Sequence, residues 1–148
     1  MSAARTTLLL GAALVAAAGA GAAVWLRPAR AVPAEDLPAG FAARVNPRAG
    51  DRAAVSEGVA LFQDNCASCH GERADGQGPA SAGLTPPPAN FRGSDVLARH
   101  SDAYLFYRMT EGKPGTAMPS FRGALAERER WALVAYLRSL TPDVAARH

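Results

Sequence analysis

The sequence predicts an all-α domain over residues 51–141, preceded by an apolar N-terminal helix. Three observations support this fold class. Apolar side chains recur at spacings of three and four residues in three separate segments, as on the buried face of a helix. No alternating run of apolar and polar residues is long enough for a strand. The helical segments are separated by long stretches rich in glycine and proline, which interrupt regular structure.

The composition excludes several classes of protein. The chain has 148 residues, which indicates one compact domain with appendages. Its two cysteines can form neither a framework of several disulfides nor a four-cysteine zinc site. The formal net charge is +3. This small and scattered excess does not make the basic stripe that nucleic-acid binding requires.

Residues 1–26 are predicted to be a targeting or anchoring segment. The uncharged run 6–26 has 21 residues, and as a helix it spans about 31 Å, enough for the core of a bilayer. Trp25 and Arg27 suit a membrane interface and favour a retained helix. The small residues at 18–22 fit instead the exit of a cleaved signal peptide. Both alternatives predict that the rest of the chain is exported.

Residues 27–50 are predicted to be a linker, and residues 142–148 a short C-terminal tail. Four prolines, at positions 28, 33, 38 and 47, suppress helix formation and favour extended chain. The linker is either a strap on the domain surface or a tether that gives the domain reach from a membrane. The sequence leaves both alternatives open.

Three helices are expected within the domain. Asp51 is the predicted N-cap of the first helix. Ser101 or Asp102 begins the second, which ends near Gly112, and the third covers about residues 125–140. A glycine inside a helix costs about 1 kcal/mol relative to alanine. We therefore expect Gly58, in the first helix, to permit the close approach of another helix.

Residues 71–93 and the segment between Pro114 and Pro119 are predicted loops. A loop as long as the first is uncommon in a compact domain without a function of its own. The core of so short a domain is also thin. Long loops around a thin core suggest that something else fills the middle.

Cys66, Cys69 and His70 form a C-x-x-C-H motif, the attachment signature of c-type haem. Two thiols at this spacing reach both vinyl groups of one porphyrin, and the adjacent imidazole can ligate its iron. A thioredoxin-type redox pair would need a βαβ context. A zinc site would need further well-placed ligands, which His100 and His148 do not provide. A simple disulfide would leave the histidine and the open loops unexplained.

A second axial ligand to the iron is expected from Met109, Met118, His100 or His148. Met118 is favoured because its loop of small residues, 115–119, can bring sulfur close to a flat ring. Met109 has the spacing of a core residue, His100 precedes a helix, and His148 is terminal. Ligation by histidine and methionine occupies both axial positions, which argues against catalysis at the iron.

These motifs resemble those of the class I bacterial cytochromes c. The resemblance covers about residues 51–141 and rests on the C-x-x-C-H motif, on Met118-Pro119, and on a last helix with Trp131 and Tyr136. It implies the class I fold, in which several helices wrap around one covalently bound haem c. Cys66 and Cys69 would form its thioethers, with His70 and Met118 as the axial ligands.

The resemblance also assigns roles to other residues. In that family the first and last helices cross closely, and Gly58 and Phe62 against Trp131 and Tyr136 match this contact. A proline after the haem motif commonly presents its carbonyl to the proximal imidazole, and Pro79 takes this role by resemblance.

The walls of the haem pocket can be proposed as well. The expected wall consists of apolar and aromatic side chains: Leu84, Phe91, Tyr104, Leu105, Phe106, Tyr107 and Phe121. The haem propionates need hydrogen bonds or positive charge nearby. Arg92 and Arg108 are the candidates for that role.

The function implied is electron transfer rather than enzymatic catalysis. The chain would carry single electrons between respiratory or photosynthetic membrane complexes, on the periplasmic side of the bacterial inner membrane. It would be anchored by its N-terminal helix or, after signal cleavage, soluble. Its partners would be redox proteins or a membrane complex, with neither nucleic acid nor a small-molecule substrate. One alternative is a fixed subunit of a larger membrane oxidoreductase, such as a terminal oxidase or dehydrogenase. Another is a haem enzyme or gas sensor with an open iron site.

Overall fold

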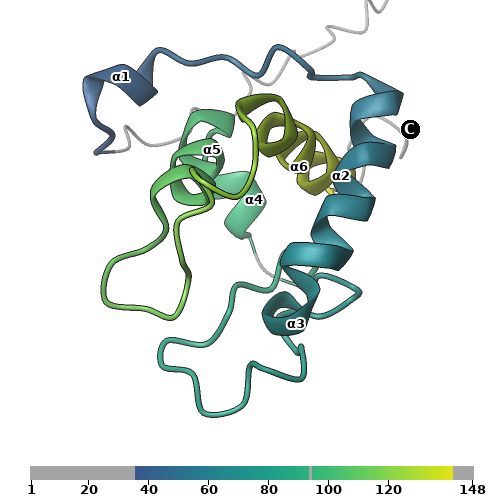
Figure 1. The fold of residues 1–148 in the computed structure, drawn as a ribbon, viewed down its shortest axis with the longest axis vertical. Coiled ribbons are helices and arrows are strands. Elements are labelled where there is room, and N and C mark those ends of the chain that lie inside the picture. The colour runs from purple at the N-terminus through teal and green to yellow at the C-terminus, as the bar shows by residue number, and fades with distance from the viewer. Residues whose placement is uncertain (1–35, 94, 142–148) are drawn as a thin grey trace, which may run out of the picture. The chain divides into compact units, whose positions relative to one another are not determined.

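A computed structural model of the protein describes residues 36–93 and 95–141 (Figure 1). The described part is helical and contains no strand, as predicted. Its helices are α1 (Ala39–Ala42), α2 (Arg52–Asn65), α3 (Ala67–His70), α4 (Val96–Arg99), α5 (Asp102–Glu111) and α6 (Glu127–Ser139). None of them is long and apolar enough to cross a bilayer. The predicted anchor over residues 6–26 and the tail over 142–148 lie outside the described residues.

The three long helices begin where capping groups satisfy their first N–H groups. The Asp51 carboxylate accepts a hydrogen bond from the Ala53 N–H at 2.8 Å, which confirms Asp51 as the N-cap of α2. Ser101 caps α5 in the same way, and Gly112, whose φ is 75°, directly follows the last residue of α5. Helix α6 begins at Glu127, two residues later than predicted, where the Glu129 carboxylate accepts the Ala126 N–H at 2.7 Å.

Three short helices of the described part were not predicted from the sequence. Helix α1 lies within the proline-rich segment, α3 directly follows α2, and α4 lies just before α5. Each has only four residues, little more than one turn. A single turn does not show the repeat of apolar residues by which longer helices are recognised.

The α2–α6 crossing is as close as Gly58 predicts. A Cβ at Gly58 would lie 2.2 Å from the Ala132 carbonyl oxygen and 2.7 Å from the Tyr136 Cβ. Four residues further along α2, the Phe62 ring meets the Tyr136 ring edge-on, with 5.2 Å between centroids. The absence of a side chain at Gly58 therefore sets the distance between the two helices.

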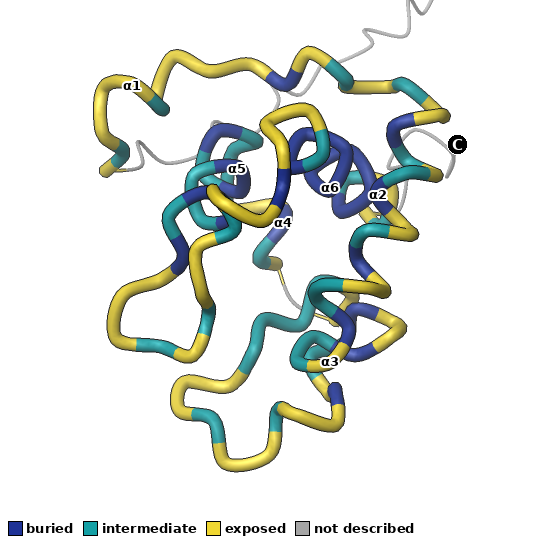
Figure 2. The backbone as a smooth tube through the Cα atoms, in the orientation of Figure 1, coloured by how far each residue is buried: buried dark blue, intermediate teal, exposed yellow. Residues whose placement is uncertain are grey.

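Trp131 does not take part in this crossing, contrary to the resemblance. Its ring stacks on Phe106 of α5, with centroids 4.0 Å apart and planes 10° apart. Successive helical residues turn by about 100°, so Trp131 points away from the side of α6 that carries Tyr136. The tryptophan thus joins α6 to α5, and Tyr136 joins α6 to α2. Figure 2 shows the buried residues gathered along these three helices, whereas the loops are largely exposed.

Residues 36–50, the described part of the predicted linker, lie along the domain as a strap. Phe41 packs edge-on against Tyr107, with 4.8 Å between centroids, and lies 6.1 Å from the ring of Phe106. Arg44 pairs with Glu127 at the start of α6, at 2.7 Å. An apolar contact and an ion pair therefore hold this segment on α5 and α6.

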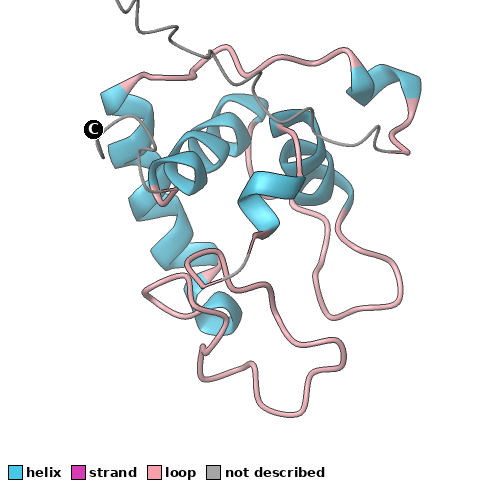
Figure 3. Cartoon of the chain, turned by 180° about the vertical axis from the view of Figure 1, so that it is seen from behind, coloured by secondary structure: helices cyan, strands magenta, loops and turns pink. Residues whose placement is uncertain are grey.

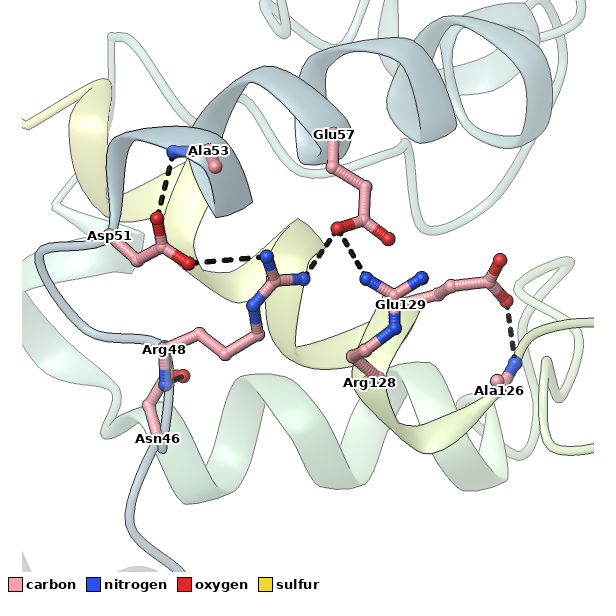
Figure 4. A network of polar contacts seen from close by, with 8 residues as sticks. All are labelled: Asn46, Arg48, Asp51, Ala53, Glu57, Ala126, Arg128 and Glu129. Carbon is pink, nitrogen blue, oxygen red and sulfur yellow. Dashed lines mark hydrogen bonds and ion pairs between the residues drawn. The ribbon is translucent and has the colours of Figure 1, made fainter.

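A polar network joins the strap to α2 and α6 (Figure 4). The Arg48 guanidinium donates to Glu57 at 2.5 Å and to Asp51 at 3.2 Å. Arg128 of α6 donates to the same Glu57 oxygen at 2.8 Å. These guanidinium groups, with the hydrogen bond from Arg48 foremost, hold the pKa of Glu57 below its ordinary value. The carboxylate therefore stays charged at neutral pH, between two cations.

The other end of α6 is fixed by Arg138. Its Nε donates to the Asp102 carboxylate at 2.6 Å, and its terminal nitrogens donate to the backbone carbonyls of Leu97 and His100. One side chain thus fixes the connection between α4 and α5 against α6. Two long loops, one before α4 and one after α5 in the sequence, extend from the same end of the helices when the domain is seen from behind (Figure 3).

Candidate functional site

The C-x-x-C-H motif forms a tight helical turn at the end of α2. Cys66 lies between the last residue of α2 and the first residue of α3, and its N–H donates to the Phe62 carbonyl at 2.8 Å. His70 closes the turn by donating its N–H to the Cys66 carbonyl at 2.8 Å. The thiols of Cys66 and Cys69 are both free. The structure therefore contains no disulfide between Cys66 and Cys69.

The imidazole of His70 is oriented by a backbone carbonyl. Its Nδ1 lies 3.0 Å from the Ala89 oxygen, and because a carbonyl can only accept, Nδ1 carries the proton. This leaves Nε2 as the nitrogen with a free lone pair. Burial lowers the pKa of His70, against the opposing effect of the hydrogen bond to Ala89. The ring also stacks on Phe91, with centroids 5.0 Å apart.

The acceptor is Ala89 and not Pro79, to which the resemblance assigned this role. The reason lies in the path of the loop. The segment Pro86–Ala89 passes beside Gly76, where a Cβ would lie 2.8 Å from the Pro88 carbonyl oxygen. Because Gly76 has no side chain, this segment comes close enough for the Ala89 carbonyl to reach His70.

Pro79 lies instead among residues that cap α3. The Gly78 N–H donates to the Cys69 carbonyl at 3.1 Å, and the Ala80 N–H donates to the Ser68 carbonyl at 2.8 Å. These bonds satisfy carbonyls that the end of a helix leaves open. A Cβ at Gly78 would lie 2.3 Å from the Ser68 oxygen. Only glycine therefore allows this loop to close against the motif.

A cavity of about 600 Å³ opens beside the motif, a volume within the range of cofactor sites. It brings together Cys66, Cys69, His70 and Met118. Five of the predicted wall residues line it: Leu84, Phe91, Tyr104, Leu105 and Phe121. Phe106 and Tyr107 do not, because they face Trp131 and the strap.

Several lining residues were not predicted as part of the wall. Phe62, Leu133 and Leu137 were indistinguishable from ordinary core in the sequence, since they show only helical apolar spacing. The Pro86–Ala89 segment has no polar or charged side chain that would indicate a functional role in the sequence. Its run of three prolines was the one available indication that this loop has a defined path.

The positions of the candidates for the second axial ligand distinguish some of them from the others. Met118, Met109 and His100 all line the cavity, whereas His148 lies outside the described residues. Met109 also belongs to the core, at 9% exposure, and the His100 ring stacks on Tyr104 at 3.9 Å. The backbone on both sides of Met118 is hydrogen-bonded: its N–H donates to Thr116 Oγ1, and its carbonyl accepts the Lys113 N–H. Met118 is thus held in a closed loop at the cavity wall.

The chemistry of these donors fits haem better than a metal ion held by side chains alone. Burial raises the pKa of the Cys66 thiol to about 11, so this sulfur is neutral and not a thiolate at pH 7. No cluster of three or more His, Cys, Asp or Glu suited to a metal occurs in residues 36–93 and 95–141. A large apolar cavity with two thiols and one oriented imidazole matches a flat macrocycle that is attached through sulfur and ligated by nitrogen.

The fold and this site define a helical protein whose C-x-x-C-H motif lies beside an apolar cavity suited to a covalently attached haem. Comparison with known families agrees, because the family model described as "Cytochrome c" matches residues 55–141, more than half of the chain. The chain therefore belongs to the cytochrome c family, and its helical fold and motif are those of a class I c-type cytochrome.

Curated relatives are larger proteins. The chain is 30% identical over 96 residues to the Cbb3-type cytochrome c oxidase subunit CcoP of Azospirillum brasilense, with 65% of this chain and 32% of that protein covered. It is 34% identical over 92 residues to the dihydro-heme d1 dehydrogenase of Pseudomonas aeruginosa, covering 62% of this chain and 16% of the enzyme. The chain thus spans at most a third of the length of these two relatives.

A solved structure shares the fold. It is the Kuenenia stuttgartiensis reducing HAO-like protein complex Kustc0457/Kustc0458, with 28% identity and a TM-score of 0.51. The match covers 60% of this chain and 44% of that one.

Proposed function

We propose that this chain is an extracytoplasmic carrier of single electrons, with one haem c attached to Cys66 and Cys69 and ligated by His70 and Met118. The observation that carries the proposal is that all four side chains line one apolar cavity. A single haem is proposed because the sequence contains one C-x-x-C-H motif and no other cysteine. When bound, haem supplies a one-electron couple at its iron.

The protein's own residues suit this task by restricting what the site can do. Ala89 holds the His70 ring with Nε2 available for ligation, and the hydrogen-bonded loop around Met118 keeps a sulfur at the cavity wall. A haem held by both His70 and Met118 would offer no open coordination site to a substrate. The apolar wall limits water and therefore limits the rearrangement that accompanies a change of charge.

The proposal is tested by adding carbon monoxide to the reduced protein. Wild type should not bind it rapidly, whereas Met118→Ala should bind it and change its visible spectrum. Met109→Leu is the matched control, because Met109 lines the same cavity and leucine conserves its volume. It should behave as wild type. Rapid binding by wild type, or an unchanged spectrum in Met118→Ala, would favour an open-site haem protein instead.

A second candidate function is a fixed subunit of a larger oxidoreductase. It is favoured by the relatives, one of which is an oxidase subunit by name. The chemistry of the haem would be the same, but the domain would be docked permanently. Sedimentation after mild solubilisation of native membranes separates the two, since a free carrier migrates alone and a subunit migrates with its complex.

We place the protein on the periplasmic side of the bacterial inner membrane, held by residues 6–26 or released after their cleavage. Two arguments support this location. Haem is attached to motifs of this kind outside the cytoplasm, and residues 1–26 have the pattern of an export segment. Fractionation of native cells tests it. An anchored protein remains with washed membranes, a cleaved one appears in the periplasmic fraction, and recovery in the cytoplasm would contradict the proposal.

A further inference from the structure

Arg108 is a cationic side chain of α5 on the cavity wall, and none of the described residues gives it an acidic partner. Its guanidinium carbon lies 5.0 Å from the centroid of the Tyr104 ring and 4.9 Å from that of Tyr107. Its Nε is buried without a hydrogen-bond partner. No ion pair with Arg108 occurs in the part of the chain that the structure describes. A buried N–H without an acceptor is costly unless a ligand satisfies it.

The cavity offers this guanidinium no anion of its own. Among the described residues, the lining groups that are charged or titratable are Cys66, Cys69, His70, His100, Tyr104, Arg108 and Lys113. None of these is an aspartate or a glutamate. Within residues 36–93 and 95–141, therefore, no carboxylate on the cavity wall meets Arg108, and a molecule that fills the cavity can supply one.

We propose that Arg108 is the positioning residue that binds a propionate carboxylate of the haem. The inference rests on the proposed function, because it takes haem as the occupant. A guanidinium presents two parallel N–H groups to a carboxylate, which fixes both the place and the plane of the anion. The two tyrosine rings beside it hold the guanidinium in position. Lys113, also on the wall, is a point charge and gives no such orientation.

The other arginine suggested by the sequence does not fit this role. Arg92 does not line the cavity, and its Nε already donates to the Arg73 carbonyl at 2.7 Å. Arg92 therefore serves as the matched control, with the same side chain on a different part of the surface.

The pairing has a consequence for the reduction potential. With Arg108 present, the bound propionate stays ionised and its charge is compensated. Without it, the uncompensated anion favours the oxidised, more positive iron, so the potential falls at alkaline pH. The propionate then takes up a proton more readily, and the potential rises again as the pH decreases.

The test is the midpoint potential of the holoprotein between pH 5 and 9. At pH 8, Arg108→Gln should lower the equilibrium constant for reduction about tenfold, which is about 59 mV for a one-electron couple. The difference from wild type should shrink toward pH 5. Arg92→Gln should match wild type throughout. The same difference should persist in a His100→Asn background, which removes the imidazole that stacks on Tyr104.

The inference is overturned if Arg108→Gln has the potential and pH profile of wild type, or if Arg92→Gln produces the same change. Should Arg108→Gln not assemble with haem, infrared difference spectra of wild type decide. A propionate that stays ionised down to pH 5 supports the inference, and titration of both propionates between pH 5 and 8 overturns it. The visible spectrum of each sample reports His/Met ligation separately, so failure here is distinguishable from failure of the proposed function.

Discussion

The replacement Gly58→Ala tests the packing that places the haem motif. Gly58 lies where α2 crosses α6, eight residues before Cys66. The new methyl group would lie 2.2 Å from the Ala132 carbonyl oxygen, where ordinary contact begins at 3.4 Å. The helices must therefore separate by more than 1 Å, because a backbone carbonyl in a helix cannot rotate away.

The magnitude follows from two opposing effects. Forcing an extra methyl group into a packed core costs about 1–3 kcal/mol, and the rigid obstacle here places the cost at the upper end. Alanine regains about 1 kcal/mol through its higher helix propensity. We expect a net loss of about 2 kcal/mol in the free energy of unfolding. In urea this lowers the midpoint by about 1 M, for a slope of about 2 kcal/mol per molar.

Urea unfolding of the holoprotein, followed by circular dichroism, measures this loss. Gly40→Ala is the matched control, since Gly40 lies in α1 and a Cβ there would meet nothing within 4 Å. The control should be as stable as wild type or slightly more stable. If Gly58→Ala proved as stable as Gly40→Ala, the close crossing would not be set by the glycine.

Four further variants test the contacts that surround this core. Arg138→Gln should lower the free energy of unfolding by about 1–3 kcal/mol, because it removes hydrogen bonds to one carboxylate and two backbone carbonyls; urea unfolding reports the loss, and Asp102→Asn should lose less. The pKa of Asp51 is lowered chiefly by the N–H groups of Ala54 and Ala53, so its charge contributes stability above its ordinary pKa that is lost as the pH falls through the lowered value. Asp51→Asn should accordingly be less stable than wild type at pH 7 and converge with it under acid, as thermal melts across the pH range can show. Phe41→Ala should release the strap from α5, which faster proteolytic cleavage within residues 36–50 would report while the visible spectrum stays unchanged.

Much of the fold was evident in the sequence because its causes are local. A capping aspartate and a capping serine mark the starts of α2 and α5, and apolar spacing marks the helices that follow. Gly58 was informative because a glycine destabilises a helix, so its presence there indicates a close contact with another helix. The C-x-x-C-H motif is likewise local, since its chemistry depends on spacing along one turn.

The remainder depends on contacts between distant parts of the chain. The acceptor for His70 is a backbone carbonyl, and no side chain at Ala89 distinguishes that carbonyl from its neighbours. The partner of Trp131 depends on the rotation of α6 relative to α5, which the apolar pattern alone does not fix. The position of the strap was likewise not predictable from local sequence. Phe41 is a single apolar residue in a proline-rich segment, and only its contact with Tyr107 of α5 shows its role. Ligation by Met118 stays a prediction that its place on the cavity wall supports.

The central claim is that Cys66 and Cys69 hold haem covalently. The most direct measurement is the intact mass of the purified mature protein under denaturing conditions. We expect the mass of the polypeptide plus one haem, with neither thiol available to an alkylating reagent. The mass of the polypeptide alone, with two thiols that react, would contradict it.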